Sequence, residues 1–213
     1  MTKPQLALSF HAALLIGALF FIVPPLTQWD TRAGFLFTLG LHWLFFCLPV
    51  IGWHALRGND WRLFSERLPW RDWWLLPTLL VQVLLVALLT FVPNTSGLTQ
   101  GGMYLALLIS AINAPLEESA WRGGFLATFR DRPRLGFWLG WVLSSLRYVP
   151  LALSQGMSFE GSALIFVAGF AVLALFWASV AWRTGSVFYT ALASFLSNFC
   201  ILWVLFDRNG FAS

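Results

Sequence analysis

The chain has 213 residues, of which 59% are hydrophobic and only 10% are charged. Soluble domains carry about 25% charged residues, so this composition excludes a water-soluble protein. Thirteen Trp and 21 Phe residues add side chains that favour bilayer interiors and interfaces. The formal charge of +4 does not indicate nucleic-acid binding, because the arginines lie mainly in short segments between apolar runs. We therefore predict an integral membrane protein, surrounded by the lipid bilayer and without a nucleic-acid partner.

The apolar runs predict an all-α, polytopic membrane helix bundle with about seven transmembrane helices. The expected helices cover residues 6–27, 33–54, 73–92, 103–128, 135–153, 161–182 and 186–206. Pro24 and Pro25 are expected to end or kink the first helix, and Pro49 to kink the second. Turn-forming residues predict loops at 93–97 and 130–134.

The cations between these helices favour one orientation. Only Arg32 and Arg208 lie on one side, whereas nine lie on the side of the N-terminus: Lys3, Arg57, Arg62, Arg67, Arg71, Arg130, Arg132, Arg134 and Arg183. The positive-inside rule then places the N-terminus in the cytoplasm and, with seven spans, the C-terminus outside. Chain size and short loops favour a bacterial inner membrane as the cell membrane of this multi-pass protein. Residues 53–74, rich in Trp and Arg, are expected to be a cytoplasmic interfacial segment. Without a visible repeat or second domain, residues 1–213 are expected to form a single transmembrane domain.

Four ionisable residues remain well inside the predicted helices, namely Glu117, Glu118, Arg122 and Arg147. Each ionised group in hydrocarbon costs several kcal/mol unless another group compensates it, and these four formal charges cancel. Glu118 and Arg122 are four residues apart, in the order that favours an ion pair on one helix. Glu117 is rotated by about 100° from Glu118 and needs another partner, a proton or water.

Polar residues of three predicted helices lie at a similar depth. Glu117 is about 16–17 Å from the cytoplasmic end of its helix, and Arg147 and Asn198 are each about twelve residues into theirs. Ser194 and Asn198 are four residues apart and share a face. A polar cluster at mid-membrane is either a functional site or a latch of paired charges that holds three helices together. The placement of charges alone leaves both alternatives open.

Three motifs resemble one family of membrane enzymes. The segment EESAWRG at 117–123 resembles the E-E-x-x-x-R signature of the CPBP family, the CAAX-protease and bacteriocin-processing (Abi) intramembrane endopeptidases. The segment RTGSVF at 183–188 resembles the lead into that family's last core helix, where Asn198 ends an H-x-x-x-N motif. Between them, SSLRY at 144–148 resembles the lead into an F-x-x-x-H motif. Order and spacing fit a CPBP-like core over about residues 103–206.

The resemblance implies a chemistry for these residues. In that family the first Glu and a histidine are thought to activate a water for attack on a peptide bond, and a second histidine with Asn stabilises the oxyanion. By resemblance Glu117 is the base, Asn198 the oxyanion donor, and Glu118 and Arg122 support them. We expect no cofactor and no metal, because two carboxylates fall short of the three protein ligands of a catalytic zinc.

The sequence departs from the family at both histidines. The aligned positions are Ala152 and Ser194, and no histidine follows His54. His42, near the middle of its predicted helix, could substitute only if that helix reached the site, and we expect it to be a packing residue. Loss of one oxyanion donor costs on the order of 100–1,000-fold in rate, and loss of acid–base assistance a similar factor.

Arg147 suggests how the cluster is balanced. We hypothesise that Arg147 pairs with Glu117, which would hold the carboxylate ionised and weaken it as a base. Alternatively, Arg147 replaces the missing imidazole as an electrostatic stabiliser, with Ser194 donating a hydrogen bond, and some hydrolysis persists.

Two functions follow from these observations. The first is a CPBP-like, glutamate-type intramembrane endopeptidase with reduced or altered activity on a membrane-associated peptide or protein. The second is a catalytically inactive membrane scaffold or regulator that binds a membrane partner or confers bacteriocin immunity. A rhomboid-like G-x-S-G with a later His, an H-E-x-x-H and a G-x-G-D are all absent. No inverted repeat supports a transporter.

Overall fold

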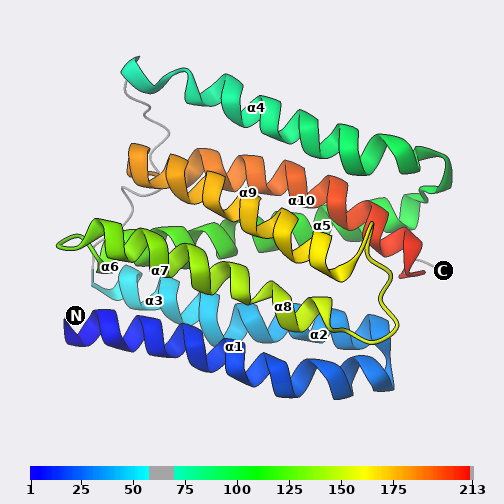
Figure 1. Cartoon of the computed structure of the whole chain (residues 1–213), viewed down its shortest axis with the longest axis horizontal. Helices are drawn as coiled ribbons and strands as arrows, with labels where there is room; N and C mark the ends of the chain where they lie inside the picture. The colour runs from blue at the N-terminus through cyan, green and yellow to red at the C-terminus, as the bar shows by residue number, and fades with distance from the viewer. Residues whose placement is uncertain (58–69, 212–213) are drawn as a thin grey trace.

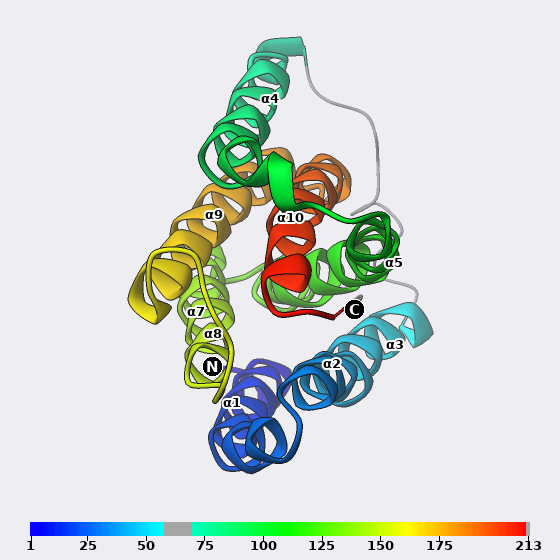
Figure 2. The same ribbon diagram turned by 90° about the vertical axis from the view of Figure 1, so that its right-hand side faces the viewer.

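The computed structural model describes residues 1–57 and 70–211, and these form helices and turns without any strand. The helices lie side by side along the longest axis of the molecule, and the two termini lie at opposite ends (Figure 1). Viewed from the end, the stack runs from α1, α2 and α3 at one edge to α4 at the other (Figure 2). The predicted all-helical, polytopic membrane bundle is confirmed.

Seven helical segments follow one another in the described part of the chain. They are α1 (Lys3–Trp29); α2 (Thr31–His42), η1 (Trp43–Cys47) and α3 (Leu48–Leu56); α4 (Leu75–Val86), η4 (Ala87–Phe91) and η5 (Val92–Gly97); α5 (Gln100–Glu117), η6 (Glu118–Gly123) and α6 (Gly124–Thr128); α7 (Pro133–Leu146) and α8 (Tyr148–Ala152); α9 (Ala163–Thr184); and α10 (Phe188–Arg208). A short 3₁₀ turn, η3 (Trp70–Asp72), precedes α4. Each predicted helix corresponds to one of these segments.

Five of the segments are long and apolar enough to cross a membrane: Lys3–Trp29, Thr31–Leu56, Leu75–Gly97, Ala163–Thr184 and Phe188–Arg208. We predicted about seven spans, which is two more than these five. One of the two additional segments, residues 100–128, carries the two glutamates and Arg122, and the other breaks at Arg147. Each of these two segments contains buried charged residues where the helix changes geometry: Glu117, Glu118 and Arg122 in the first, and Arg147 in the second.

Prolines change the helices less than expected. Pro24 and Pro25 do not end α1, which continues to Trp29, so that part of the prediction is wrong. The Thr27 hydroxyl donates to the Val23 carbonyl at 2.9 Å and so stabilises the turn that contains both prolines.

Two other predicted features have a different geometry. Pro49 follows the π-helical segment η1, whose wider turn gives the proline ring room against the preceding carbonyls. Residues 93–97, predicted as a loop, lie inside the 3₁₀ helix η5, so this prediction is wrong. A loop was predicted at 130–134. The structure has a turn at 129–132, and α7 begins at Pro133, within the predicted loop.

The helices pack around two large apolar clusters. One joins α1, the second segment and η6–α6, and includes a row of stacked rings at Phe46, Trp121, Phe125 and Phe129. The other joins α2, α5, α8, α9 and α10. Gly136 permits the close approach of α7 to the end of α6, because a Cβ there would lie 2.5 Å from the Phe129 Cβ. The candidate site lies where these two clusters meet.

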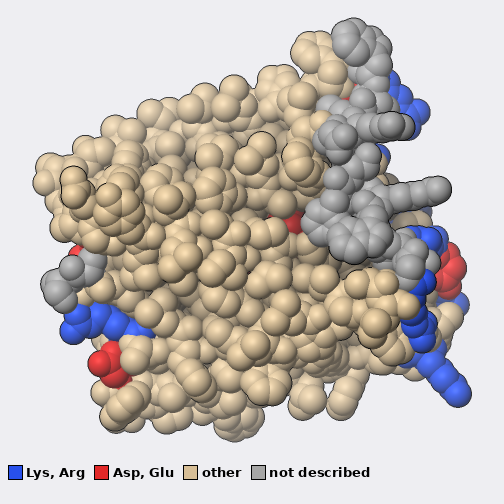
Figure 3. Space-filling view, turned by 180° about the vertical axis from the view of Figure 1, so that it is seen from behind, with Lys and Arg blue, Asp and Glu red and all other residues tan. Residues whose placement is uncertain are grey.

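Charged side chains gather at the two ends of the molecule (Figure 3). Among the described residues, seven of the nine cations assigned to the N-terminal side lie beside helix ends there, and Arg32 and Arg208 lie at the other end. Arg62, Arg67 and most of the expected interfacial segment lie outside the described residues.

One buried acid ties α4 to α9 at the N-terminal end. Asp72 is 1% exposed, and its Oδ1 accepts a hydrogen bond from Arg183 Nε at 2.8 Å. This hydrogen bond holds the pKa of the Asp72 carboxyl below its usual range, although burial acts in the opposite direction. The ion pair therefore stabilises the place where α4 begins.

Candidate active site

The E-E-x-x-x-R motif lies at a change in helix geometry. The α-helix α5 ends at Glu117, and the π-helical segment η6 begins at Glu118. A π turn is wider than an α turn and occurs frequently at functional sites. Another π-helical segment, η1, begins directly after His42 and packs against η6. These wide turns bring the second and fourth helical segments together at the motif.

The Glu117 carboxylate is 1% exposed and makes three hydrogen bonds. Its Oε1 accepts from the Arg147 guanidinium and, at 2.8 Å, from the Tyr148 hydroxyl. Its Oε2 accepts from Asn113 Nδ2 at 2.7 Å. The hypothesised ion pair between Arg147 and Glu117 is therefore confirmed. An ionised carboxylate has about four lone-pair sites, so about one remains for a water or a substrate group.

Arg147 reaches Glu117 because the helix breaks at this residue. Pro150 has no N–H to donate to the preceding turn, and α7 gives way to α8 at Arg147. The guanidinium lies 4.3 Å from the centre of the Tyr148 ring and 6.0 Å from that of Trp121. With 1% exposure, Arg147 is a buried cation held between a carboxylate and two aromatic rings.

Glu118 and Arg122 form the predicted pair next to this centre. Arg122 Nη1 lies 3.2 Å from Glu118 Oε1 and 3.9 Å from Glu117 Oε1. Glu118 also lies against Thr190, but neither of its oxygens has a hydrogen bond of good geometry. Arg122 lies 5.7 Å from the Trp177 ring centre. The second carboxylate is therefore fully buried with one cation as its main partner.

His42 packs against Phe46 and Trp121, as expected of a packing residue, and it also contacts the cluster through Arg147. It is 1% exposed, and its Nδ1 lies 3.0 Å from Arg147 Nη1. Its Nε2 lies 2.9 Å from Trp121 Nε1 and 3.4 Å from Cys47 Sγ. Arg147 and Trp121 are both donors, whereas a neutral imidazole accepts at only one nitrogen. The imidazole therefore lies between these two donors and accepts from only one of them.

A small cavity of about 30 Å³ lies beside the Glu117–Arg147 pair. Its polar lining comes from Glu117, Arg147, Tyr148, Asn113 and Asn198, and its apolar lining from α2, α5, α8, α9 and α10. A volume above about 15 Å³ with several polar partners is enough for a water molecule. The structure thus brings three of the predicted site residues, from three helical segments, around one space of molecular size.

The two positions aligned with the missing histidines lie differently. Ser194 is fully buried, and its Oγ accepts a hydrogen bond from Asn198 Nδ2 at 3.3 Å. It therefore orients Asn198 rather than lining the cavity. Ala152 is buried at the end of α8 and is not among the residues that line the cavity.

The donor set around the cavity does not suit a divalent metal. Arg147 occupies one carboxylate oxygen of Glu117, and a second cation at that oxygen would be repelled. Within residues 1–57 and 70–211, no three His, Cys, Asp or Glu side chains form a group that could hold a metal ion. The groups that line the cavity are therefore suited to bind water and a carbonyl oxygen.

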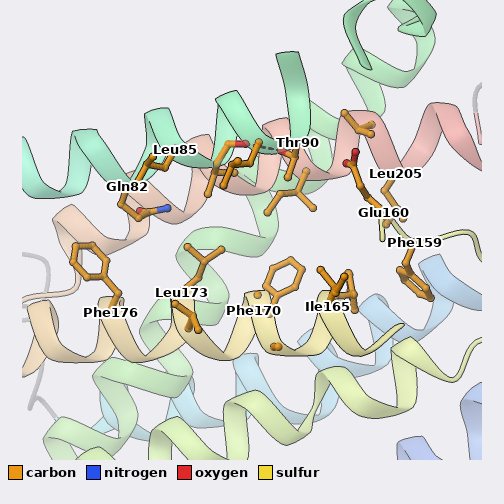
Figure 4. A pocket seen from close by; sticks show the side chains of 18 of the residues that line it. Gln82, Leu85, Thr90, Phe159, Glu160, Ile165, Phe170, Leu173, Phe176 and Leu205 are labelled. Atoms are coloured by element: carbon orange, nitrogen blue, oxygen red, sulfur yellow. Dashed lines mark hydrogen bonds between the residues drawn. The ribbon is translucent and has the colours of Figure 1, made fainter. Parts of the chain in front are cut away.

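A much larger groove of about 810 Å³ lies between α4 on one side and α9 and α10 on the other. In Figure 4, Gln82 and Leu85 of α4 and Thr90 of η4 face Phe176, Leu173 and Ile165 of α9 across it. Three side chains, Phe166, Phe170 and Leu205, line both this groove and the small cavity. They form the wall between the lipid-facing groove and the buried site.

Together, the fold and site define a polytopic helical membrane protein with a carboxylate centre in its interior. Residues 98–200 match the model of the family described as Rce1-like, type II CAAX prenyl endopeptidase. The resemblance to the CPBP and CAAX-protease family of intramembrane endopeptidases is therefore confirmed for this segment, which is slightly less than half of the chain. The matched residues contain no histidine, and His42 lies outside them. No curated protein and no solved structure shows a significant similarity to the chain.

The R-T-G-S segment has a structural role that explains its pattern. Arg183 binds Asp72, and Gly185 ends α9 with a φ of 68°, a left-handed conformation that favours glycine. Thr184 Oγ1 accepts from the Ser186 N–H at 3.2 Å, and Ser186 Oγ accepts from the Phe188 N–H at 3.2 Å. The segment therefore ends one helix and starts the next, which places Asn198 at the cavity.

Proposed function

We propose that the protein is an intramembrane endopeptidase of the CAAX type, with an altered catalytic set, that slowly hydrolyses a peptide bond in a membrane-associated peptide or protein. The observation that carries this proposal is the water-sized cavity lined by Glu117, Arg147, Tyr148 and Asn198. A latch of paired charges needs no such space, whereas hydrolysis needs a place for the attacking water beside a base and oxyanion donors.

In the proposed reaction a water in the cavity uses the remaining lone pair of Glu117. Glu117 takes a proton from this water as the oxygen forms a bond to the carbonyl carbon of the substrate. Arg147 and Asn198 donate to the carbonyl oxygen as it becomes an oxyanion. The C–N bond then breaks, and Glu117 returns its proton to the leaving nitrogen. Glu118 and Arg122 hold the helix that presents Glu117.

His42 is a positioning residue in this scheme, because it touches Arg147 rather than the cavity. The guanidinium lies between the Glu117 carboxylate and the His42 ring, and contacts on both sides restrict its orientation. The contact of His42 with Arg147 brings an imidazole from the second helical segment to the site. The segment that matches the family model, residues 98–200, contains no histidine of its own.

The rate is expected to be low. Three donors already occupy Glu117, and no imidazole takes the positions of Ala152 and Ser194. Oxyanion donors and acid–base groups each contribute about 100-fold or more to an ordinary enzyme. We therefore expect turnover several orders of magnitude below that of a family member with both histidines.

A second candidate function is a catalytically inactive scaffold that binds a membrane partner. The hydrogen bonds to both Glu117 oxygens favour this function. Together with the contact between Arg147 and His42, they join α5, α7–α8 and the second helical segment, as a structural latch would. Regulation of a partner or bacteriocin immunity would then be the retained role.

A cleavage assay separates the two. Purified protein in nanodiscs is incubated with a library of fluorogenic peptides, and the wild type is compared with Glu117→Gln and Glu117→Ala. Asp131→Asn, a carboxylate at the N-terminal end of the bundle, is the matched control. The proposal expects cleavage by the wild type and the control and a loss of at least about 100-fold in both Glu117 variants. Equal background from all four favours the scaffold.

We further propose that the N-terminus lies in the cytoplasm of a bacterial inner membrane, and that residues 1–213 form one transmembrane unit. The excess of cations at the N-terminal end supports this orientation. Single cysteines at Asp131 and Asn209, at opposite ends of the bundle, test it with a membrane-impermeant thiol reagent on intact spheroplasts. The proposal expects only the Asn209→Cys variant to react, and the reverse pattern overturns it.

A further inference from the structure

The groove between α4, α9 and α10 has the shape and chemistry of a lipid site. We propose that it binds an acyl chain of a zwitterionic phospholipid, whose phosphate lies beside Arg208 and whose ammonium lies beside Glu160. This inference is independent of the proposed hydrolysis, because it requires no reaction at Glu117.

The walls of the groove are mostly apolar, although Gln82 and two threonines also line it. Leu85 of α4 and Leu89 of η4 line one side, and Leu173 and Phe176 of α9 line the other. The stretch of α4 and η4 that lines it, from Thr78 to Thr90, is about 18 Å long, and the corresponding stretch of α9 is about 17 Å long. Half of a hydrocarbon core of about 30 Å is about 15 Å, so the groove matches the depth of one leaflet.

Charge is found at one end only, at the level where α4, α9 and α10 leave the expected hydrocarbon region. Arg208 Nη2 lies 3.8 Å from Glu160 Oε1, and these residues are about one third exposed. Asn94 joins them, since its Nδ2 donates to Glu160 at 2.9 Å and its Oδ1 accepts from Arg208 at 3.0 Å. In Figure 4 the Glu160 carboxylate lies at the end of the groove. A cation and an anion side by side complement a phosphate joined to an ammonium.

Lipid fits these walls better than a helix of a partner protein. Helix–helix contacts in membranes are enriched in small residues that let two backbones approach closely. The groove is lined mostly by large aliphatic and aromatic side chains, with Gly169 and Ala168 as the only small residues from α9. A flexible hydrocarbon chain follows such an uneven surface.

Occupation of the groove would also affect the buried site. Phe166, Phe170 and Leu205 separate the groove from the small cavity. An acyl chain packed against these three side chains would hold them in place. It would thereby separate water in the cavity from the hydrocarbon of the membrane.

The test uses Gly169, where an added Cβ meets no atom within 4 Å. Wild type, Gly169→Leu and Gly169→Trp are reconstituted in nanodiscs of equal phosphatidylethanolamine and phosphatidylglycerol. Lipid that remains bound after release from the nanodisc is counted by native mass spectrometry. Gly17→Trp on α1, which also has open space at its Cβ, is the matched control. Melting curves show that each variant is folded.

We expect about one phosphatidylethanolamine per wild-type and Gly17→Trp molecule, about threefold less with Gly169→Leu and at least tenfold less with Gly169→Trp. Glu160→Gln leaves only the cation at the mouth and should switch the preference to phosphatidylglycerol. No retained lipid in the wild type, equal retention in both Trp variants, or a preference that Glu160→Gln leaves unchanged would each overturn the proposal. So would recovery of a partner polypeptide in place of lipid.

Discussion

Glu117 and Arg147 should be strongly coupled in their contributions to the free energy of unfolding. Both side chains are 1% exposed, so Arg147→Met leaves a buried carboxylate without its cation. Breaking a buried pair in this way destabilises by about 3–5 kcal/mol. For a chain of this size about 1 kcal/mol corresponds to 2–4 °C, so the melting temperature should fall by roughly 6–20 °C. Glu117→Gln, which leaves the cation uncompensated, should cost a similar amount.

The double variant Glu117→Gln/Arg147→Met removes both charges and should cost less than the sum of the two single changes by at least about 2 kcal/mol. Chemical and thermal unfolding in one detergent supplies the four values of this double-mutant cycle. Asp131 and Arg132, an exposed pair 3.9 Å apart, provide a control cycle with a coupling below about 1 kcal/mol. Additivity at Glu117 and Arg147 within about 0.5 kcal/mol would refute the reasoning.

Three further predictions address the histidines and the end of α4. His42→Gln, which keeps an acceptor, should retain most of the cleavage rate, whereas His42→Leu should lower kcat about tenfold or more with little change in KM; equal rates would contradict the positioning role. Ala152→His combined with Ser194→His should leave the rate at or below that of the wild type in the same assay, because neither position lines the cavity and Ser194 orients Asn198; a gain of about 100-fold would contradict this placement. Asp72→Asn should lower the melting temperature at pH 7, because the ionised carboxyl is stabilised by Arg183. Since the pKa of Asp72 is held below its usual range, this difference should shrink as the pH falls through that lowered pKa, and a difference that persists in acid would contradict it.

The fold was largely predictable because long apolar runs leave few alternatives in a bilayer. The charges at Glu118 and Arg122 were also paired correctly, since helical spacing alone brings residues four apart together. The continuation of α1 through Pro24 and Pro25 was not predictable, because neighbouring groups, such as the Thr27 hydroxyl, stabilise a helix that a local rule would end.

The site was predictable only in part. Matched depth and cancelling charge were enough to pair Arg147 with Glu117, because an isolated buried charge is so costly. The hydrogen bonds of Asn113 and Tyr148 to Glu117 depend on side-chain directions that spacing does not specify. The contact of His42 with Arg147 was not predicted, because it joins segments far apart in the sequence. The depth of His42 near the middle of an apolar helix was the available signal.

Incorporation of oxygen from labelled water tests the central claim most directly. Wild-type protein and Glu117→Gln are incubated with a cleavable peptide in H₂¹⁸O, and the fragments are weighed by mass spectrometry. The proposed mechanism predicts one ¹⁸O atom in the new carboxyl terminus with the wild type and no product above background with Glu117→Gln. Labelled product in equal amounts from both proteins, or none from either, would contradict catalysis by this buried carboxylate.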